Sequence, residues 1–566
     1  MDTQRHLHAI AGSLLLALLL AACNVPDQSA PPPISPPAAT SPAAVEHRIG
    51  IRLVDGAGEF YDRVTGEKFT PRGMNYIHLA EQPTDDGGRT VYHSLFDPGR
   101  YEPALVGEAL EKMKEAGYNT VRVFMSQNTI DAPDGGLSDE YLANMADFIT
   151  QAQANGLFVM PTIDWSPGGR YGQLLLTTCC EQFNMNNAQY LPSGGVRANA
   201  AFFQDLVRGL VDQGAPLEAV LSFELRNEMY FDTDFAPFTL TSGSVTTANG
   251  KSYDMGSASD RELMVDENTV TFINSVRTAI LEVDATALVS VGFFVPSGPN
   301  PARIGDARLV STYPAIWQSE ADFIDLHPYP GGELTLQKYV ENFEMEGMQE
   351  KPILMGEFGV NRGDVPSLSR AAQMAVDWQV ESCAYGFDGW LFWTWDTDEQ
   401  PEFYNAVQDE ALIGRNLSPA LRPDPCSREG ATESEVNLAL GKSVTATHSN
   451  QSPAENAVDG TGAAWGAGAP PPQWITIDLG ATYAVSAIRL SVGQYPNGGT
   501  THEVWVGDRW DGLQKVHVFD GVTSDGDLLV FAPDAPLEDV RFVRIVTTHS
   551  PSWVAWKEIE VIQAAQ

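Results

Sequence analysis

An eightfold alternation of short apolar segments with longer helical patterns runs through the middle of the chain and constrains its fold most. Continuous apolar segments such as LFVMPTI (157–163) and GWLFWTW (389–395) are typical of parallel strands buried on both faces. Helical patterns such as Ser138–Asn155 separate them. Eight such units in about 330 residues predict an α/β fold, the (β/α)8 TIM barrel. An open doubly wound sheet is the alternative, but no glycine-rich nucleotide-binding sequence follows any predicted strand.

The residues that can carry chemistry gather at the C-terminal ends of the predicted strands, where TIM-barrel active sites lie. Glu228 ends the fourth strand and Glu357 the seventh. Two convergent carboxylates suit glycosidic cleavage, since one protonates the leaving oxygen while the other attacks the sugar or activates water. Neighbouring strands supply groups that can keep a carboxylate ionised, hydrogen-bond to it or stack on a sugar. These groups are Arg122, Asn227, His327, Tyr329 and Trp393.

The same residues stand in motifs that resemble glycoside hydrolase clan A, and especially family 5, the cellulase and mannanase family. The motifs are ELRNE (224–228), DLHPY (325–329), MGEFG (355–359) and GWLFWTW (389–395), supported by PRGMNY (71–76) and NTVRVF (119–124). The resemblance covers roughly residues 50–420 and implies that Glu228 is the acid/base and Glu357 the nucleophile of a retaining double displacement. It also implies that the other five residues line the sugar subsite and that no metal or organic cofactor is required.

The sequence departs from this family at one position and carries two long insertions. Asp164-Trp165 is followed by Ser166, where many family members have a histidine. Insertions at about 166–195 and 230–260 are expected to reshape the cleft. The first holds two adjacent cysteines, which could join each other in an oxidising compartment, or one of them could pair with a later cysteine. The sequence leaves the pairing open among Cys179, Cys180, Cys383 and Cys426.

Beyond residue 435 the helical pattern gives way to short strands. QWITIDLG (473–480), VSAIRLSV (485–492), THEVWVG (501–507) and VRFVRIVTT (540–548) predict an all-β sandwich. The phrases ALGKSVTATHS, AENAVDG and SWVAWKEIEVI resemble the discoidin-like factor V/VIII type C domain. In carbohydrate enzymes the counterpart of that jelly-roll domain is carbohydrate-binding module family 32, whose ligand contacts lie in variable loops.

The aromatic residues of this domain divide into two groups. Trp465, Trp474 and Trp556 are expected in the core, whereas Tyr495 and Trp553 are candidates to stack on a sugar. Some relatives of the domain hold a structural calcium near the AVDG turn, which makes Asp459 a candidate ligand.

The N-terminal residues predict export. Ile10–Ala22 is an apolar stretch too short to span a bilayer comfortably but suited to a signal-peptide core. Leu20-Ala21-Ala22-Cys23 resembles the lipobox of bacterial lipoproteins, in which the cysteine is acylated; an ordinary secretory signal is the alternative. The Pro/Ala/Ser-rich residues that follow suit an extended tether. We therefore expect an extracytoplasmic protein, lipid-anchored at the bacterial cell surface or envelope and touching the membrane only through that anchor.

Charge and domain organisation complete the prediction. The chain has 74 acidic and 34 basic residues, a net charge of −40, which disfavours nucleic acid as a partner. The expected domains are a signal peptide (1–22), a tether (23–46), a catalytic barrel (47–422), a linker (423–435) and a carbohydrate-binding sandwich (436–566). We expect an enzyme that hydrolyses β-linked poly- or oligosaccharides of mannan or glucan type. The alternatives are a non-catalytic glycan-binding or adhesion protein and a transglycosylase.

Overall fold

A computed structural model describes residues 46–564, except 84–87, 133–134, 178–181, 295–307, 310–312, 331–334, 344, 346, 432–434, 451 and 462. The predicted signal peptide, Cys23 with the tether up to residue 45, and the pair Cys179 and Cys180 lie outside the described residues. Within the described ranges, no helix is long and apolar enough to cross a bilayer.

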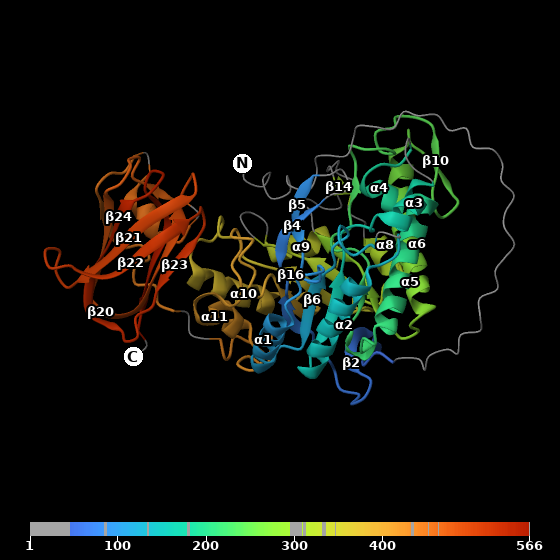
Figure 1. The fold of residues 1–566 in the computed structure, drawn as a ribbon, viewed down its shortest axis with the longest axis horizontal. Helices are drawn as coiled ribbons and strands as arrows, with labels where there is room; N and C mark the ends of the chain where they lie inside the picture. Colours follow the sequence, from blue (N-terminus) through green and yellow to red (C-terminus); the bar gives the residue numbers. More distant parts are fainter. Residues whose placement is uncertain are drawn as a thin grey trace.

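The larger domain is a (β/α)8 barrel, as the alternating pattern predicts (Figure 1). Seven parallel strands pair in the order β13, β15, β16, β17, β3, β6, β7. The pairing of β8 with β12, and a bridge from Val159 of β7 to Val220 ahead of β8, continue the barrel between β7 and β13. β7 and β17 overlap the apolar segments 157–163 and 389–395 that predicted them, and the fifth barrel strand is divided into β12 and β13. The bounds are β3 (Arg72–Asn75), β6 (Thr120–Phe124), β7 (Phe158–Thr162), β8 (Phe223–Glu224), β12 (Val289–Ser290), β13 (Gly292–Phe294), β15 (Ile324–His327), β16 (Ile353–Phe358) and β17 (Phe387–Phe392).

Helices surround these strands, and their ends follow local sequence signals. The Ser138 side chain accepts a hydrogen bond from the Tyr141 amide, and the Ser367 side chain accepts one from the Arg370 amide, so each serine caps a helix. The helices are α1 (Pro103–Glu115), α2 (Asp139–Ala154), α5 (Ser193–Asp212), α6 (Ala258–Leu281), α8 (Tyr313–Gln318), α9 (Leu336–Asn342), α10 (Leu368–Cys383) and α11 (Gln408–Leu417).

The two ends of the barrel are covered differently. A hairpin of β1 (Ile49–Val54) and β2 (Ala57–Asp62) packs Ile49 and Phe60 onto apolar side chains at the N-terminal ends of the strands. A second hairpin, β4 (Leu79–Pro83) with β5 (Arg89–His93), follows β3 at the opposite end (Figure 1). The C-terminal ends of the barrel strands therefore meet on the side of the β4–β5 hairpin, at the end of the barrel opposite to the β1–β2 hairpin.

The two insertions pack together. The first forms α3 (Gly169–Leu176) and α4 (Asn186–Tyr190). Asn187 of α4 donates from Nδ2 to the backbone oxygens of Asp232 (2.8 Å) and Ala236 (3.0 Å) in the second insertion. α3 packs alongside α5, where Tyr171 Oη donates to Asp205 at 2.8 Å, and in Figure 1 α3, α4 and β10 are grouped near the upper part of α5 and α6. The remaining strands are β9 (Phe231–Asp232), β10 (Ser244–Thr246) and β11 (Ser252–Asp254), with β14 (Arg308–Leu309) pairing with β9.

The C-terminal domain is an antiparallel β-sandwich with its own core, as predicted. Trp465 and Trp556 are fully buried in that core. The prediction for Trp474 is wrong. Ile475 and Ile477 point into the core, and because side chains alternate along a strand, Trp474 points outward. The Arg544 guanidinium lies over its ring, 4.7 Å from the centroid. The strands are β18 (Ser443–Ala446), β19 (Trp465–Gly466), β20 (Gln473–Gly493), β21 (Gly498–Gly507), β22 (Gln514–Thr523), β23 (Leu528–Phe531), β24 (Leu537–His549) and β25 (Ala555–Gln563).

The segment between the domains is attached along α10. Cys383, the last residue of α10, forms a disulfide with Cys426, with the Cα atoms 5.8 Å apart. The sequence left the pairing of four cysteines open. The structure pairs Cys383 with Cys426, so neither of them is bonded to Cys179 or Cys180. Arg428 adds an ion pair with Asp377 of α10. The chain thus enters the sandwich from a fixed point on the barrel.

Candidate active site

Arg122, the middle residue of β6, lies at the centre of the catalytic cluster and is fully buried. Its Nη1 donates to Glu357 Oε1 (2.6 Å) and to Asn75 Oδ1 (2.9 Å). Its Nη2 donates to Asn227 Oδ1 (2.7 Å), and Nε and Nη2 donate to the two oxygens of Glu224 (2.7 and 3.1 Å). A planar guanidinium with fixed donors therefore holds four side chains, from the ends of β3, β8 and β16, in one arrangement.

Glu228 and Glu357 meet at this mouth. One carboxylate oxygen from each, together with a ring nitrogen of His327, lie within 4.8 Å of one another. The Glu357 side chain is only 4% exposed and accepts a hydrogen bond from Tyr329 Oη at 2.7 Å. The Glu228 side chain is 25% exposed and lies 3.3 Å from His327 Nδ1. One carboxylate is thus enclosed, whereas solvent reaches the other.

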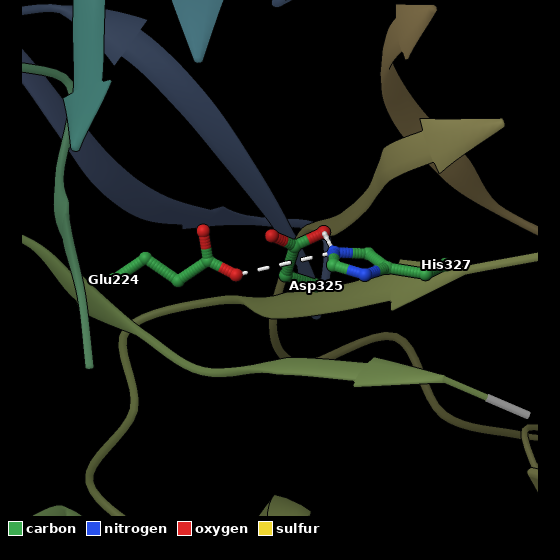
Figure 2. A group of neighbouring side chains, drawn as sticks. All are labelled: Glu224, Asp325 and His327. Atoms are coloured by element: carbon green, nitrogen blue, oxygen red, sulfur yellow. Dashed lines mark ion pairs between the residues drawn. The ribbon is translucent and has the colours of Figure 1, made fainter. Parts of the chain in front are cut away.

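A second layer of buried ionisable groups lies beside this pair (Figure 2). His327 Nε2 is 3.7 Å from Asp325 Oδ1 and 3.9 Å from Glu224 Oε1, and all three residues are buried. Two glycines leave room for the carboxylates. A Cβ on Gly356 would come within 2.0 Å of Asp325 Oδ1, and a Cβ on Gly292 within 2.4 Å of Glu224 Oε1.

The electrostatics of the cluster favour a charged histidine. Burial alone would lower the pKa of His327, but Glu357 and Asp325 outweigh it and raise that pKa well above its usual value. Burial raises the pKa of Glu357, and the positive charges of His327 and Arg122 partly offset this increase. Burial raises the pKa of Glu224 to about 8, against the opposing effect of Arg122.

Two groups of these side chains lie close enough to hold a metal ion, Glu224 with Asp325 and His327, and Glu228 with His327 and Glu357. Arg122 already donates to both oxygens of Glu224. The donors therefore fit a network of ion pairs in which arginine and histidine supply the positive charge.

An aromatic wall, formed by Phe124, Tyr329, Trp393 and Phe403, borders the carboxylates. Trp393 follows β17, and its Nε1 donates to Gln400 Oε1 at 2.9 Å. Its ring lies edge-on to Phe124 with 5.7 Å between centroids, and the rings of Tyr329 and Phe403 are also 5.7 Å apart. The structure thus brings all seven residues singled out in the barrel sequence to one mouth.

Three further residues of the site were not singled out from sequence: Asn75, Glu224 and Asp325. Asn75 is the last residue of β3 and lies in the motif PRGMNY, whereas Glu224 lies four positions before Glu228 and Asp325 two positions before His327. Because strand side chains alternate, that spacing places them on the inner face, and this signal could have found them. Ser166, where a histidine was expected, donates to Gln189 Oε1 at 2.9 Å instead.

In the sandwich, Asp459 ends a short 3-10 helix (Ala454–Val458), and its carboxylate accepts a hydrogen bond from the Thr461 amide. Among the residues that the structure describes, Asp459 belongs to no group of three carboxylate, imidazole or thiol ligands. Tyr495 and Trp553 are 90% and 62% exposed. Their loops are neighbours, since a Cβ on Gly498 would lie 3.0 Å from Pro551.

Comparison with known proteins identifies the families of the two domains. Residues 92–399 match the cellulase family, glycosyl hydrolase family 5, and residues 441–559 match the F5/8 type C domain. A probable glucan 1,3-beta-glucosidase A from Aspergillus clavatus is 24% identical over 334 residues, which cover 56% of this chain and 74% of that protein.

Two solved structures resemble the barrel. An exo-beta-1,4-mannosidase from Opitutaceae bacterium strain TAV5 is 18% identical with a TM-score of 0.40, and the match covers 61% of this chain and 55% of that protein. This chain therefore spans about half the length of that enzyme. A beta-mannanase from the blue mussel Mytilus edulis is 16% identical with a TM-score of 0.42, over 69% of this chain and 100% of the mussel protein.

The family match spans more than half of the 566 residues and contains both glutamates, Arg122, Tyr329 and Trp393. The chain belongs to glycosyl hydrolase family 5, a family of hydrolases, and carries an F5/8 type C domain after its barrel.

Proposed function

We propose that this protein is a retaining glycoside hydrolase that cleaves β-linked poly- or oligosaccharides of mannan or glucan type. The observation that carries the proposal is the approach of Glu228 and Glu357, whose nearest ligand oxygens lie within 4.8 Å. Retaining glycosidases hold their two carboxyl groups about 5–5.5 Å apart, whereas inverting enzymes separate them by about 6.5–9.5 Å to admit a water. The spacing here supports the retaining class.

The environments of the two carboxylates support distinct roles. Glu357 is enclosed and receives hydrogen bonds from Arg122 and Tyr329, which stabilise its charge and hold its oxygens in place. We assign it as the nucleophile. Glu228 lies against His327 and is partly open to solvent, as required of a group that exchanges protons with a leaving group and then with water.

The reaction then proceeds in two steps. A Glu357 oxygen attacks the anomeric carbon as the glycosidic C–O bond breaks, and Glu228 gives its proton to the departing oxygen. In the second step Glu228 takes a proton from water while the water oxygen attacks the same carbon and displaces Glu357. The sugar leaves with its configuration retained, and both carboxyl groups return to their starting protonation states.

The remaining residues suit the binding of a sugar ring. Trp393 has a flat face fixed by its bond to Gln400, and Asn227 is oriented by Arg122. In the sandwich, we assign the exposed rings of Tyr495 and Trp553, which lie on neighbouring loops, to stacking on a glycan. The cellulase family match and the Aspergillus relative, a probable glucan 1,3-beta-glucosidase, support a β-linked glycan as the substrate.

We further propose that the enzyme works outside the cytoplasm, anchored by a lipid on Cys23. The support for this is the sequence Leu20-Ala21-Ala22-Cys23 after an apolar stretch, followed by proline-rich residues. Metabolic labelling with a fatty-acid analogue tests it: wild type should carry label and Cys23→Ser should not.

The deciding experiment measures reducing-sugar release from mannan, mixed-linkage glucan, carboxymethylcellulose and xylan. Wild type is compared with Glu357→Gln and with the matched control Glu108→Gln, an exposed glutamate on the outer helix α1. Release by wild type and Glu108→Gln, and its loss in Glu357→Gln, would support the proposal and name the polymer. Equal release by all three proteins would refute the nucleophile assignment. Glycan binding without release by any of them would favour a non-catalytic binding protein.

A further inference from the structure

The barrel and the sandwich share a buried polar interface beside α10 and α11 (Figure 1). Arg489 on β20 has a side chain only 2% exposed and forms ion pairs with Asp409 at the start of α11 and with Glu435. Glu560 on β25 accepts hydrogen bonds from Ser367 Oγ (2.8 Å) and from the Leu368 amide (3.0 Å) at the start of α10. If the two domains separated, these buried polar and charged groups would lose their partners, which is energetically costly. The interface therefore specifies one position of the sandwich relative to the barrel.

A second part of this interface lies on the catalytic side of the barrel. Arg362, which follows β16, is 6% exposed and donates from Nη1 to the backbone oxygen of Gly526 in the sandwich at 2.9 Å. Leu528, the first residue of β23, packs against the barrel core. Ser491 Oγ donates to the backbone oxygen of Pro366 at 2.6 Å. The sandwich therefore touches the loop that leaves the strand carrying Glu357.

That loop is joined to the one after β17. We call residues 359–366 and 399–405 the docking loops. The Arg362 amide donates to the Glu402 oxygen at 2.8 Å, the Arg362 guanidinium lies 4.8 Å from the ring centroid of the fully buried Tyr404, and Asn361 forms a β-bridge with Phe403. A displacement of either loop would move the other.

The docking loops also hold the aromatic wall of the active site. Gln400 accepts the hydrogen bond from Trp393 Nε1, and Phe403 packs against Tyr329. Tyr329 in turn donates to Glu357. An unbroken series of contacts thus leads from Gly526 in the sandwich to the carboxylate of the proposed nucleophile.

We propose that the β-sandwich is a structural part of the active site, and that its contact with Arg362 positions the docking loops and, through them, Trp393 and Tyr329. A carbohydrate-binding domain that acts only by concentrating the enzyme on a polymer leaves the hydrolysis of small substrates unchanged. Here the domain also affects small substrates, because it supports side chains that bind the sugar ring. Arg362 and Gly526 are positioning residues, and the inference rests on the proposed glycosidase function.

The test perturbs the sandwich and leaves every barrel residue unaltered. Gly526 has φ +88°, a conformation in which a β-branched side chain is strained, so Gly526→Val should displace the loop that receives the Arg362 hydrogen bond. The matched control is Gly480→Val, also in the sandwich, with φ +87° and no atom within 4 Å of an added Cβ. Both variants introduce similar backbone strain, but only the first lies against the barrel.

The assay measures kcat and KM on a small aryl β-glycoside that fills the sugar subsite only. Misplacement by about 1 Å can cost up to about a hundredfold, and we expect kcat/KM to fall by about tenfold or more in Gly526→Val, mainly through kcat. Gly480→Val should match wild type. Equal kcat/KM in both variants, with the sandwich folded in each, would overturn the inference.

The same contact can be tested from the barrel side. Arg362→Ala should reproduce the loss, and Arg362→Lys, which keeps a cationic donor but loses the planar group over Tyr404, should lie between Arg362→Ala and wild type. Full activity in Arg362→Ala would also overturn the inference. Failure of the proposed function is distinguishable, because the wild-type protein would then hydrolyse no aryl β-glycoside at all.

Discussion

Removing the hydroxyl of Tyr329 should change the acidity of the proposed nucleophile in a predictable direction. Tyr329 Oη donates to Glu357 Oε2 at 2.7 Å, and this bond lowers the pKa of Glu357 because it stabilises the charged form. Tyr329→Phe keeps the ring and its contact with Phe403 but deletes the donor. The pKa of Glu357 should therefore rise.

The magnitude follows from the type of bond. A hydrogen bond to a charged group contributes about 1.5–3 kcal/mol, and one pKa unit corresponds to about 1.4 kcal/mol, so the rise should be about 1–2 units. Glu357 must be ionised to attack. The acidic limb of the pH profile of kcat/KM should therefore move upward by that amount, and activity at mildly acidic pH should fall about tenfold or more.

The assay is hydrolysis of an aryl β-glycoside across the pH range of stable folding. The limb reports an apparent pKa of the coupled carboxylates. Tyr118→Phe is the matched control, since it also removes a buried hydroxyl, one that donates to the Gly414 oxygen at 2.6 Å outside the catalytic cluster. An acidic limb that stays at its wild-type position in Tyr329→Phe would refute the assigned contact and role.

Three further predictions concern the acid/base, the acid stability of the sandwich and the disulfide. Glu228→Ala should keep activity on aryl glycosides with good leaving groups in the first step but lose it on unactivated oligosaccharides, and equal losses on both would contradict the acid role. Burial lowers the pKa of His502 from 6.5 to about 4, so the unfolded chain takes up the proton first. The contribution of the neutral His502 to the free energy of unfolding of the sandwich is therefore fully present above pH 6.5, and it falls by roughly 2–3 kcal/mol towards pH 4.5. Thermal unfolding should show a smaller acid loss in His502→Gln than in the exposed control His549→Gln, and equal losses would argue against this prediction. The disulfide between Cys383 and Cys426 closes 43 residues, so replacing both cysteines by serine should lower the free energy of unfolding by about 2–4 kcal/mol, and an unchanged denaturation midpoint would exclude a stabilising role.

Much of the barrel and its site could be predicted because the signals are local. Parallel strands buried on both faces must be apolar along their whole length, and this made strands such as β6, β7 and β16 visible in the sequence. The strand order of a (β/α)8 barrel brings all C-terminal ends to one face. Glu228 and Glu357 could therefore be placed together although 129 positions separate them.

The sequence by itself determined the two folds and the seven side chains at the mouth, through periodicity, strand-end positions and the resemblance those motifs carry. Only the tertiary structure decided that Glu224 and Asp325 form a buried layer around His327, that Cys383 pairs with Cys426, and that Arg489 and Arg362 join the sandwich to the barrel. The physical reason is that a periodic pattern states which face of an element is buried. The pairing of buried polar and charged side chains from distant elements depends on how those elements pack together, and a periodic pattern does not encode that packing.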